Sequence, residues 1–289
     1  MKYAFMKQHK SEYYIAVMAR ILAVTVSGYK KWLKRLPSQR VIKRQNLALL
    51  IRAQHDETRE VYSAIRMHRH LCKLGHTPSF HQVRSIREQE GIRCKRHKKI
   101  KVTTNSNHDK PIFENILDQK FEMQRPNQAW VSDITYIWTG EGWLYLAGVK
   151  DLYTKELVGY CISSRMTADI VVKALEMGIR RRRPSKGLIV HSDRGSQYCS
   201  KVYRNLIEQQ GFVGSMSKRG CCYDNAPIES FWGVLKNELI YHKDYQTRQE
   251  VIADVTNYIE VFYNRQRIQA KIGFRSPAKV FEDFFKAAS

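Results

Sequence analysis

Residues 130–136 read Trp-Val-Ser-Asp-Ile-Thr-Tyr, and this stretch decides the fold because it places Asp133 inside a run of strand-forming residues. β-Branched and aromatic residues of this kind favour extended backbone. A carboxylate inside a central strand is costly unless its charge is compensated, and a metal ion is a good candidate for that. We therefore predict a strand over 130–138 with a metal-binding aspartate at its middle. A buried ion pair with an arginine is the alternative.

A second acid, Asp193, follows the short apolar run 188–191. Such a run is typical of a buried parallel strand, and α/β sheets place ligands at the carboxyl ends of parallel strands. Gly195 is expected to allow a sharp exit turn and so to shape the site. The alternative for Asp193 is a simple turn cap.

A third acid, Glu229, lies in the first turn of a predicted helix. Pro227 suits the first helical position, and Asp224 or Asn225 is expected to cap the helix. Asn225 is also expected to shape the site. Favourable interaction with the helix dipole is the alternative explanation for Glu229.

The order of elements around these acids predicts the fold class. Periodicity and turn residues indicate strands at 130–138, 143–149, 156–163, 188–191 and 212–216, and helices at 168–182, 201–210 and 227–239. Three strands, a helix, a strand, a helix and a strand is the order of a ribonuclease-H-like α/β fold with a mixed five-stranded sheet.

The positive charge is concentrated at the front of the chain. The net charge is +23, and residues 1–110 hold 25 Lys and Arg against 7 Asp and Glu, whereas residues 111–289 hold 25 against 20. Such asymmetry indicates a polyanionic partner such as DNA. A basic surface that serves solubility alone is the alternative.

Helical patterns fill this basic part, over 12–22, about 25–33, 59–74 and 79–90. They predict two helix-turn-helix-like modules, at 1–50 and 51–93, with a plain helical bundle as the alternative. A basic linker would span 94–122, and the α/β core with C-terminal helices 123–289. The six scattered cysteines form no zinc pattern and indicate reduced thiols in the cytoplasm. No secretion signal or membrane-spanning run is present in the sequence.

Three motifs resemble those of insertion-sequence-3-type transposases, which carry the Asp-Asp-Glu triad of retroviral integrases. They are 126–136 around Asp133, 191–198 around Asp193, and 224–238 around Glu229, and 35 residues separate the last two acids. The front of the chain resembles the OrfB product of these elements. Gln269 stands where the family commonly has His, which leaves the role of that C-terminal motif open.

The resemblance implies an integrase catalytic core that cleaves 3′ ends of DNA and transfers the strands. Two Mg²⁺ or Mn²⁺ ions are expected, with Asp133 bridging both, Asp193 on one and Glu229 on the other. The implied partners are double-stranded DNA, an upstream OrfA protein or an OrfA–OrfB fusion, and further copies of the chain on DNA, with no membrane. The implied place of action is the bacterial nucleoid.

Further residues follow from the motifs. Lys236 lies two helical turns beyond Glu229 and is expected to contact DNA phosphate, and the resemblance extends that role to Asn264 and Arg267. Trp232 and His191 are expected to pack rather than to act. Two other functions remain open: a ribonuclease-H-type metal nuclease that never joins strands, and a non-catalytic DNA-binding regulator.

Overall fold

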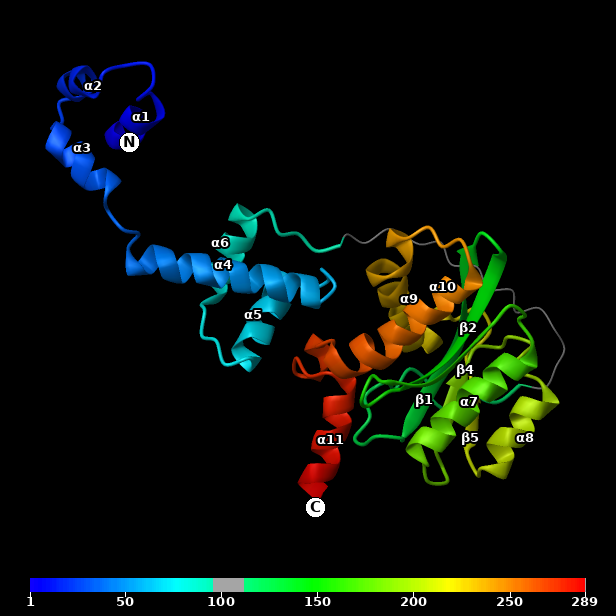
Figure 1. The fold of residues 1–289 in the computed structure, drawn as a ribbon. Helices are drawn as coiled ribbons and strands as arrows, with labels where there is room; N and C mark the ends of the chain where they lie inside the picture. The colour runs from blue at the N-terminus through cyan, green and yellow to red at the C-terminus, as the bar shows by residue number, and fades with distance from the viewer. Residues whose placement is uncertain (96–111, 289) are drawn as a thin grey trace. The chain divides into compact units, whose positions relative to one another are not determined.

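The computed structural model describes residues 1–95 and 112–288, and it divides into two compact units, 1–53 and 54–289. Figure 1 shows the chain coloured from the N-terminus to the C-terminus. None of the helices in the described part of the chain is long and apolar enough to cross a membrane.

The first unit contains three short helices and most of a fourth. Met6, Met18, Ala19 and Tyr29 form its small buried core. Thr25 caps α3, because its hydroxyl accepts a hydrogen bond from the Gly28 N–H at 3.0 Å. The helices are α1 (Lys2–Gln8), α2 (Ile15–Ile21), α3 (Val26–Leu33) and α4 (Gln39–Glu57), which runs past the boundary into the second unit.

The second unit begins with a helix pair, α5 (Ala64–Lys73) and α6 (Phe80–Gln89). The predicted helix over 59–74 is wrong at its start. Arg59 and Glu60 adopt positive φ angles of 57° and 62°, which no right-handed helix accommodates, and Ser63 caps α5 instead. The pair is anchored within the unit by Tyr62, whose hydroxyl donates to the Gln266 carbonyl at 3.2 Å and accepts from the Ile268 N–H at 2.9 Å.

A five-stranded mixed sheet forms the centre of the second unit, in the order β3-β2-β1-β4-β5. The strands β1, β2 and β3 are antiparallel, whereas β4 and β5 run parallel to β1. This topology is that of the predicted ribonuclease-H-like fold. The strands are β1 (Ala129–Thr139), β2 (Gly142–Asp151), β3 (Leu157–Ser163), β4 (Ile189–Ser192) and β5 (Val213–Met216).

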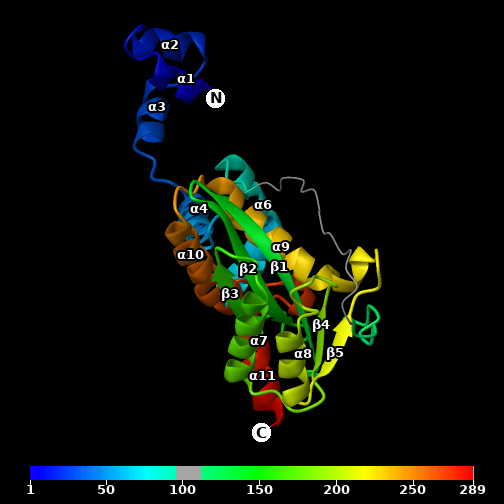
Figure 2. The same cartoon turned by 90° about the vertical axis from the view of Figure 1, so that its right-hand side faces the viewer.

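Helices cover both faces of the sheet. Figure 2 shows α7 (Ala168–Arg182) and α8 (Lys201–Gln209) side by side against it. Trp130, Ala147 and Val149 point to that face and join the main hydrophobic core. Because side chains alternate along a strand, Asp133 and Gly148 point to the other face, where α9 (Ala226–Glu238) packs on β1 and β2.

C-terminal helical segments complete this unit. Short 3₁₀ turns flank α9 at Cys222–Asn225 and Ile240–His242, and a third lies at Ala270–Ile272. The helix α10 (Arg248–Asn257) continues directly as a π-helix over Tyr258–Gln266, and α11 (Pro277–Ala288) follows. The sequence predicted further helices after 239 without resolving their bounds.

Candidate active site

The pairing of β1 with β4 brings two of the predicted acids together. The two strands run parallel, and their last paired residues are Ser132 and Ser192. Asp133 is the next residue of β1, and Asp193 directly follows the end of β4, so the two acids lie at the same level of the sheet. Adjacent strands lie about 4.8 Å apart, which puts the two side chains within reach of a shared ligand. Both are half-buried.

The third acid enters from the helix that covers this face. Glu229 lies in the first turn of α9, as predicted, and the helix begins at Ala226, one residue before the Pro227 that the sequence places first. Burial and the charge of Asp193 raise the pKa of Glu229. Burial, then Asp193 and Glu229, raise the pKa of Asp133 well above its ordinary value. The three carboxylates therefore act on one another electrostatically, although the described residues include no group of three such side chains already arranged around a metal position.

Trp232 holds the carboxylate of Asp133. Its indole N–H donates to Asp133 Oδ2 at 3.0 Å. The ring reaches this position because residue 148, opposite Asp133 on β2, is glycine: a Cβ there would lie 2.6 Å from the Trp232 ring. The sequence predicts a packing role for Trp232, and the ring is indeed buried. Its hydrogen bond was missed, although its position one helical turn after Glu229 carried the signal.

Gly195 positions the carboxylate of the second acid, Asp193, through its main chain, because it has no side chain in the way. Its N–H donates to Asp193 Oδ1 at 2.9 Å, and a Cβ would lie 3.0 Å from that oxygen. The predicted sharp turn is confirmed, since the Tyr198 N–H donates to the Gly195 carbonyl at 2.9 Å, and Gly195 makes this turn without a positive φ. The glycine also lets the main chain approach the carboxylate closely.

Asn225 ties the loop before α9 to the strand that carries Asp133. Its side-chain N–H donates to the Ser132 carbonyl at 3.0 Å, and the residue is buried. Asn225 occupies the N-cap position of α9, as one of the two predicted caps, but its side chain forms no capping hydrogen bond. The other predicted cap, Asp224, uses its carboxylate in the preceding loop, where it accepts hydrogen bonds from the Lys218 N–H at 2.7 Å and from Asn115 and Gln119. Both residues position the start of α9 from the loop.

Comparison with known proteins places this site in a family. Models of the integrase core domain match residues 123–222 and 229–280. The 31 kDa protein of insertion element IS600 from Shigella sonnei is 46% identical over 272 residues, covering 94% of this chain and all of that protein. Transposase InsF of insertion sequence IS3A from Escherichia coli (strain K12) is 39% identical over 279 residues, covering 96% and 97%. The chain belongs to the insertion-sequence-3 transposase family.

Retroviral integrases are also similar to this transposase. The catalytic core of HTLV-2 integrase in complex with magnesium is 13% identical, with a TM-score of 0.44, covering 55% of this chain and 99% of that chain. The catalytic core domain of BIV integrase is 18% identical, with a TM-score of 0.40, covering 56% and 98%.

Lys236 of the transposase lies beside the acids, on the next turns of α9. Burial lowers the pKa of its ammonium group, while the charge of Asp133 opposes that shift. The ammonium nitrogen lies 4.9 Å from the centre of the Tyr136 ring. The side chain of Lys236 is half-buried.

Arg267 and Asn264, which the sequence predicts to contact DNA, lie inside the protein. Both are buried, with 4% and 3% of their surface exposed. Arg267 forms two hydrogen bonds with the Glu238 carboxylate at 2.6 and 2.8 Å, and Asn264 is paired with the main chain of Leu157 at 3.1 Å in both directions. Because these groups are already satisfied inside the protein, the predicted direct contact with DNA is wrong for both.

Two other predicted positions are part of the packing. His191 is buried, its ring nitrogens meet the Ser215 and Ser217 hydroxyls at 2.9 and 3.2 Å, and burial lowers its pKa to about 4. Gln269 pairs through its main chain with Arg275 at 3.0 Å, in a short antiparallel bridge. Neither residue reaches the carboxylates through any of these hydrogen bonds.

Proposed function

We propose that this transposase cleaves the 3′ ends of its element and joins them to a second phosphodiester, using Asp133, Asp193 and Glu229 as metal ligands. The observation that carries the proposal is the position of Asp133 and Asp193, one residue beyond the Ser132–Ser192 pair on adjacent parallel strands. Family membership supports the reaction, because the relatives matched over nearly the whole chain include a transposase.

The three acids fit hard divalent cations such as Mg²⁺ or Mn²⁺. Their donors are all carboxylate oxygens, which these ions prefer. The raised pKa values of Asp133 and Glu229 reflect burial and mutual repulsion, and a cation at this point would relieve the repulsion. Asp133, Asp193 and Glu229 would hold two such ions, whose chemistry when bound is to activate the attacking oxygen and to stabilise the leaving oxygen.

The chain's own residues prepare this site by fixing the ligands. Trp232 orients Asp133, and the Gly195 N–H orients Asp193. Asn225 anchors the loop that leads into α9 and Glu229. Lys236, at the edge of the carboxylates, would hold a phosphate of the DNA next to the scissile bond.

The helical N-terminal part of the chain would supply most of the contacts with DNA. We propose helix-turn-helix-like modules at 1–50 and 51–93, a basic linker over 94–122, most of which lies outside the described residues, and the catalytic core over 123–289. Two DNA ends must be cut and joined together, so the working form would be an oligomer on DNA. An OrfA protein or fusion would assist end recognition, and the nucleoid DNA would be the place of action.

The test is a cleavage and strand-transfer assay on labelled element-end DNA with Mg²⁺ or Mn²⁺, for the natural chain and Asp193→Asn. We expect the natural chain to cut and join, and the variant to bind DNA without cutting. Asp169→Asn is the matched control, because Asp169 is an exposed acid paired with Lys173 on α7. Cut ends without joined products would indicate a nuclease, and equal behaviour of all three proteins would overturn the assignment of the triad.

A further inference from the structure

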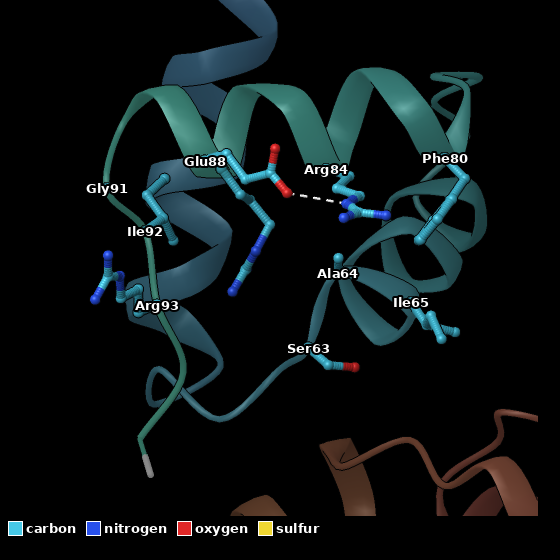
Figure 3. A pocket seen from close by; sticks show the side chains of 10 residues that line it. Ser63, Ala64, Ile65, Phe80, Arg84, Glu88, Gly91, Ile92 and Arg93 are labelled. Carbon is cyan, nitrogen blue, oxygen red and sulfur yellow. Dashed lines mark hydrogen bonds and ion pairs between the residues drawn. The ribbon is translucent and has the colours of Figure 1, made fainter.

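A pocket of about 500 Å³ lies between α5 and α6, in the helix pair that precedes the catalytic core. It is remote in sequence from the three acids and takes no part in the proposed reaction. Figure 3 shows the start of α5 on one side, α6 on the other, and the chain leaving α6 at one end. The lining residues are Ser63, Ala64, Ile65, Phe80, Arg84, Arg87, Glu88, Gly91, Ile92 and Arg93.

Arg87 is the unusual member of this lining. Its side chain is almost entirely buried, with 5% exposed. Nη2 donates a weak hydrogen bond to Cys94 Sγ at 3.6 Å, and Nη1 has no hydrogen-bond partner in the described part of the chain. No described carboxylate forms an ion pair with it. A buried guanidinium without an anion is costly, so Arg87 lacks, within the described residues, the negative charge that would compensate it.

The positive charge of Arg87 affects the protonation of a neighbouring buried side chain, His55. His55, also buried, lies close enough that burial and the positive charge of Arg87 together lower the pKa of its imidazole. The Nδ1 atom of His55 likewise has no hydrogen-bond partner in residues 1–95 or 112–288. Arg87 Nη1 and His55 Nδ1 are thus two buried nitrogen atoms that find no hydrogen-bond partner among the described residues.

Two further groups at the pocket favour an anion. Arg93 lines it from the segment after α6, and the first turn of α5 begins at its wall. The first N–H groups of a helix have no partner within the helix and carry partial positive charge. The one acid in the lining, Glu88, is paired with Arg84 at 2.9 Å, as the dashed line in Figure 3 marks.

We propose that this pocket binds a phosphate group, held by Arg87, Arg93 and the N-terminus of α5. A guanidinium recognises phosphate through paired hydrogen bonds, and helix N-termini are common phosphate sites. The volume exceeds what phosphate alone requires, and Ile65, Phe80 and Ile92 provide apolar walls, so a nucleotide is the fitting carrier. That nucleotide is either part of a DNA strand or free.

The first experiment uses a matched pair of variants at Ile65, which is 54% exposed and therefore tolerant of substitution. Ile65→Glu introduces a carboxylate that competes for the same cationic groups, and Ile65→Gln has the same shape without charge. Titration of the full chain with inorganic phosphate, against chloride at equal ionic strength, measures binding. We expect phosphate to bind the natural chain and Ile65→Gln, and Ile65→Glu to weaken it by about tenfold or more.

A second arm separates the two sources of phosphate. Binding of duplex element-end DNA is measured over a range of salt for the natural chain, Arg87→Gln and the Ile65 pair. A salt slope reduced by about one in Arg87→Gln, with weaker DNA binding by Ile65→Glu than by Ile65→Gln, identifies DNA as the source. Loss of phosphate binding with unchanged DNA binding identifies a free phosphate compound.

The proposal fails if the natural chain does not distinguish phosphate from chloride and the Ile65 variants behave alike in both arms. Failure of the proposed transposition chemistry would appear elsewhere, in the cleavage assay. We expect Asp193→Asn to bind phosphate as the natural chain does, because Asp193 lies outside the lining of this pocket.

Discussion

The two ends of α9 hold two glutamates in opposite electrostatic situations. At the beginning, Glu229 is half-buried, and its pKa is raised by burial and by the charge of another acid, Asp193. At the end, Glu238 is buried and accepts hydrogen bonds from Arg267 at 2.6 and 2.8 Å and from the Tyr258 hydroxyl at 2.7 Å. One helix therefore carries an uncompensated acid and a fully compensated one.

This difference separates function from structure within a single element. A buried carboxylate with an arginine and a phenol around it has no capacity left for a ligand, and its removal leaves the arginine uncompensated. A carboxylate that faces other carboxylates destabilises the fold by repulsion, and a protein retains such an arrangement where a cation is to be bound. The comparison predicts opposite effects for the same substitution at the two positions.

The largest effect is expected from Glu229→Gln. We expect strand cleavage and joining to fall by roughly a thousandfold, because one metal ligand is lost. The free energy of unfolding should stay the same or rise, since the repulsion from Asp193 is relieved. A cleavage assay together with urea denaturation measures both quantities.

Glu238→Gln is the matched opposite at the other end of the helix. It removes the charge that compensates Arg267, so we expect a loss of about 3 kcal/mol in the free energy of unfolding, with activity per folded molecule largely retained. If Glu238→Gln were as stable as the natural chain, or if Glu229→Gln remained active, the contrast between the two ends would be wrong.

The sequence predicted the core well because its signals there are local. The strand around Asp133, the short parallel strand before Asp193 and the proline at the start of α9 all depend on nearby residues, and the structure has them at these positions. The triad in turn followed from spacing and neighbouring motifs. Its role in metal binding stays a prediction.

The errors about site residues mostly concern contacts between segments far apart in the chain. The roles of Arg267 and Asn264 depend on Glu238 and Leu157, 29 and 107 residues away, which no periodicity reveals. The hydrogen bond of Trp232 to Asp133 likewise spans 99 residues and depends on the small size of Gly148. A polar residue in a family motif can therefore be mistaken for a DNA contact when its hydrogen-bond partner lies in a distant segment of the same protein.

Trp232→Phe sharpens the comparison at the beginning of α9. The phenyl ring stays aromatic, but it loses the hydrogen bond to Asp133 and the outer indole atoms Cη2 and Cζ2 that approach Gly148. We expect activity to fall about tenfold to a hundredfold and the Mg²⁺ concentration for half-maximal activity to rise, as for other groups that orient metal ligands. A merely structural role would lower the melting temperature without moving the Mg²⁺ dependence. Phe231→Leu, a packing change on the neighbouring residue, serves as the control.

The smallest effect concerns Lys150, a third charged residue packed against α9. Its ammonium group is buried, donates to the Pro227 carbonyl at 2.9 Å, and has its pKa lowered by burial to about 7. The unfolded chain keeps the ordinary value of 10.5, so between pH 7 and 10.5 the unfolded state binds more protons than the folded state. Stability contributed by this group must therefore rise with pH across that window.

Lys150→Met removes this titration while keeping a long, flexible side chain. From pH 8 to pH 9, we expect the natural chain to gain about 1 kcal/mol of unfolding free energy relative to the variant, measured by urea denaturation at each pH. A constant difference would mean that Lys150 stays charged in the fold, held by Pro227 and the Phe231 ring 5.7 Å away. In that case a buried cation would lie beside the beginning of α9. The electrostatic difference between the Glu229 end and the Glu238 end of this helix would then be smaller than the two carboxylates alone indicate.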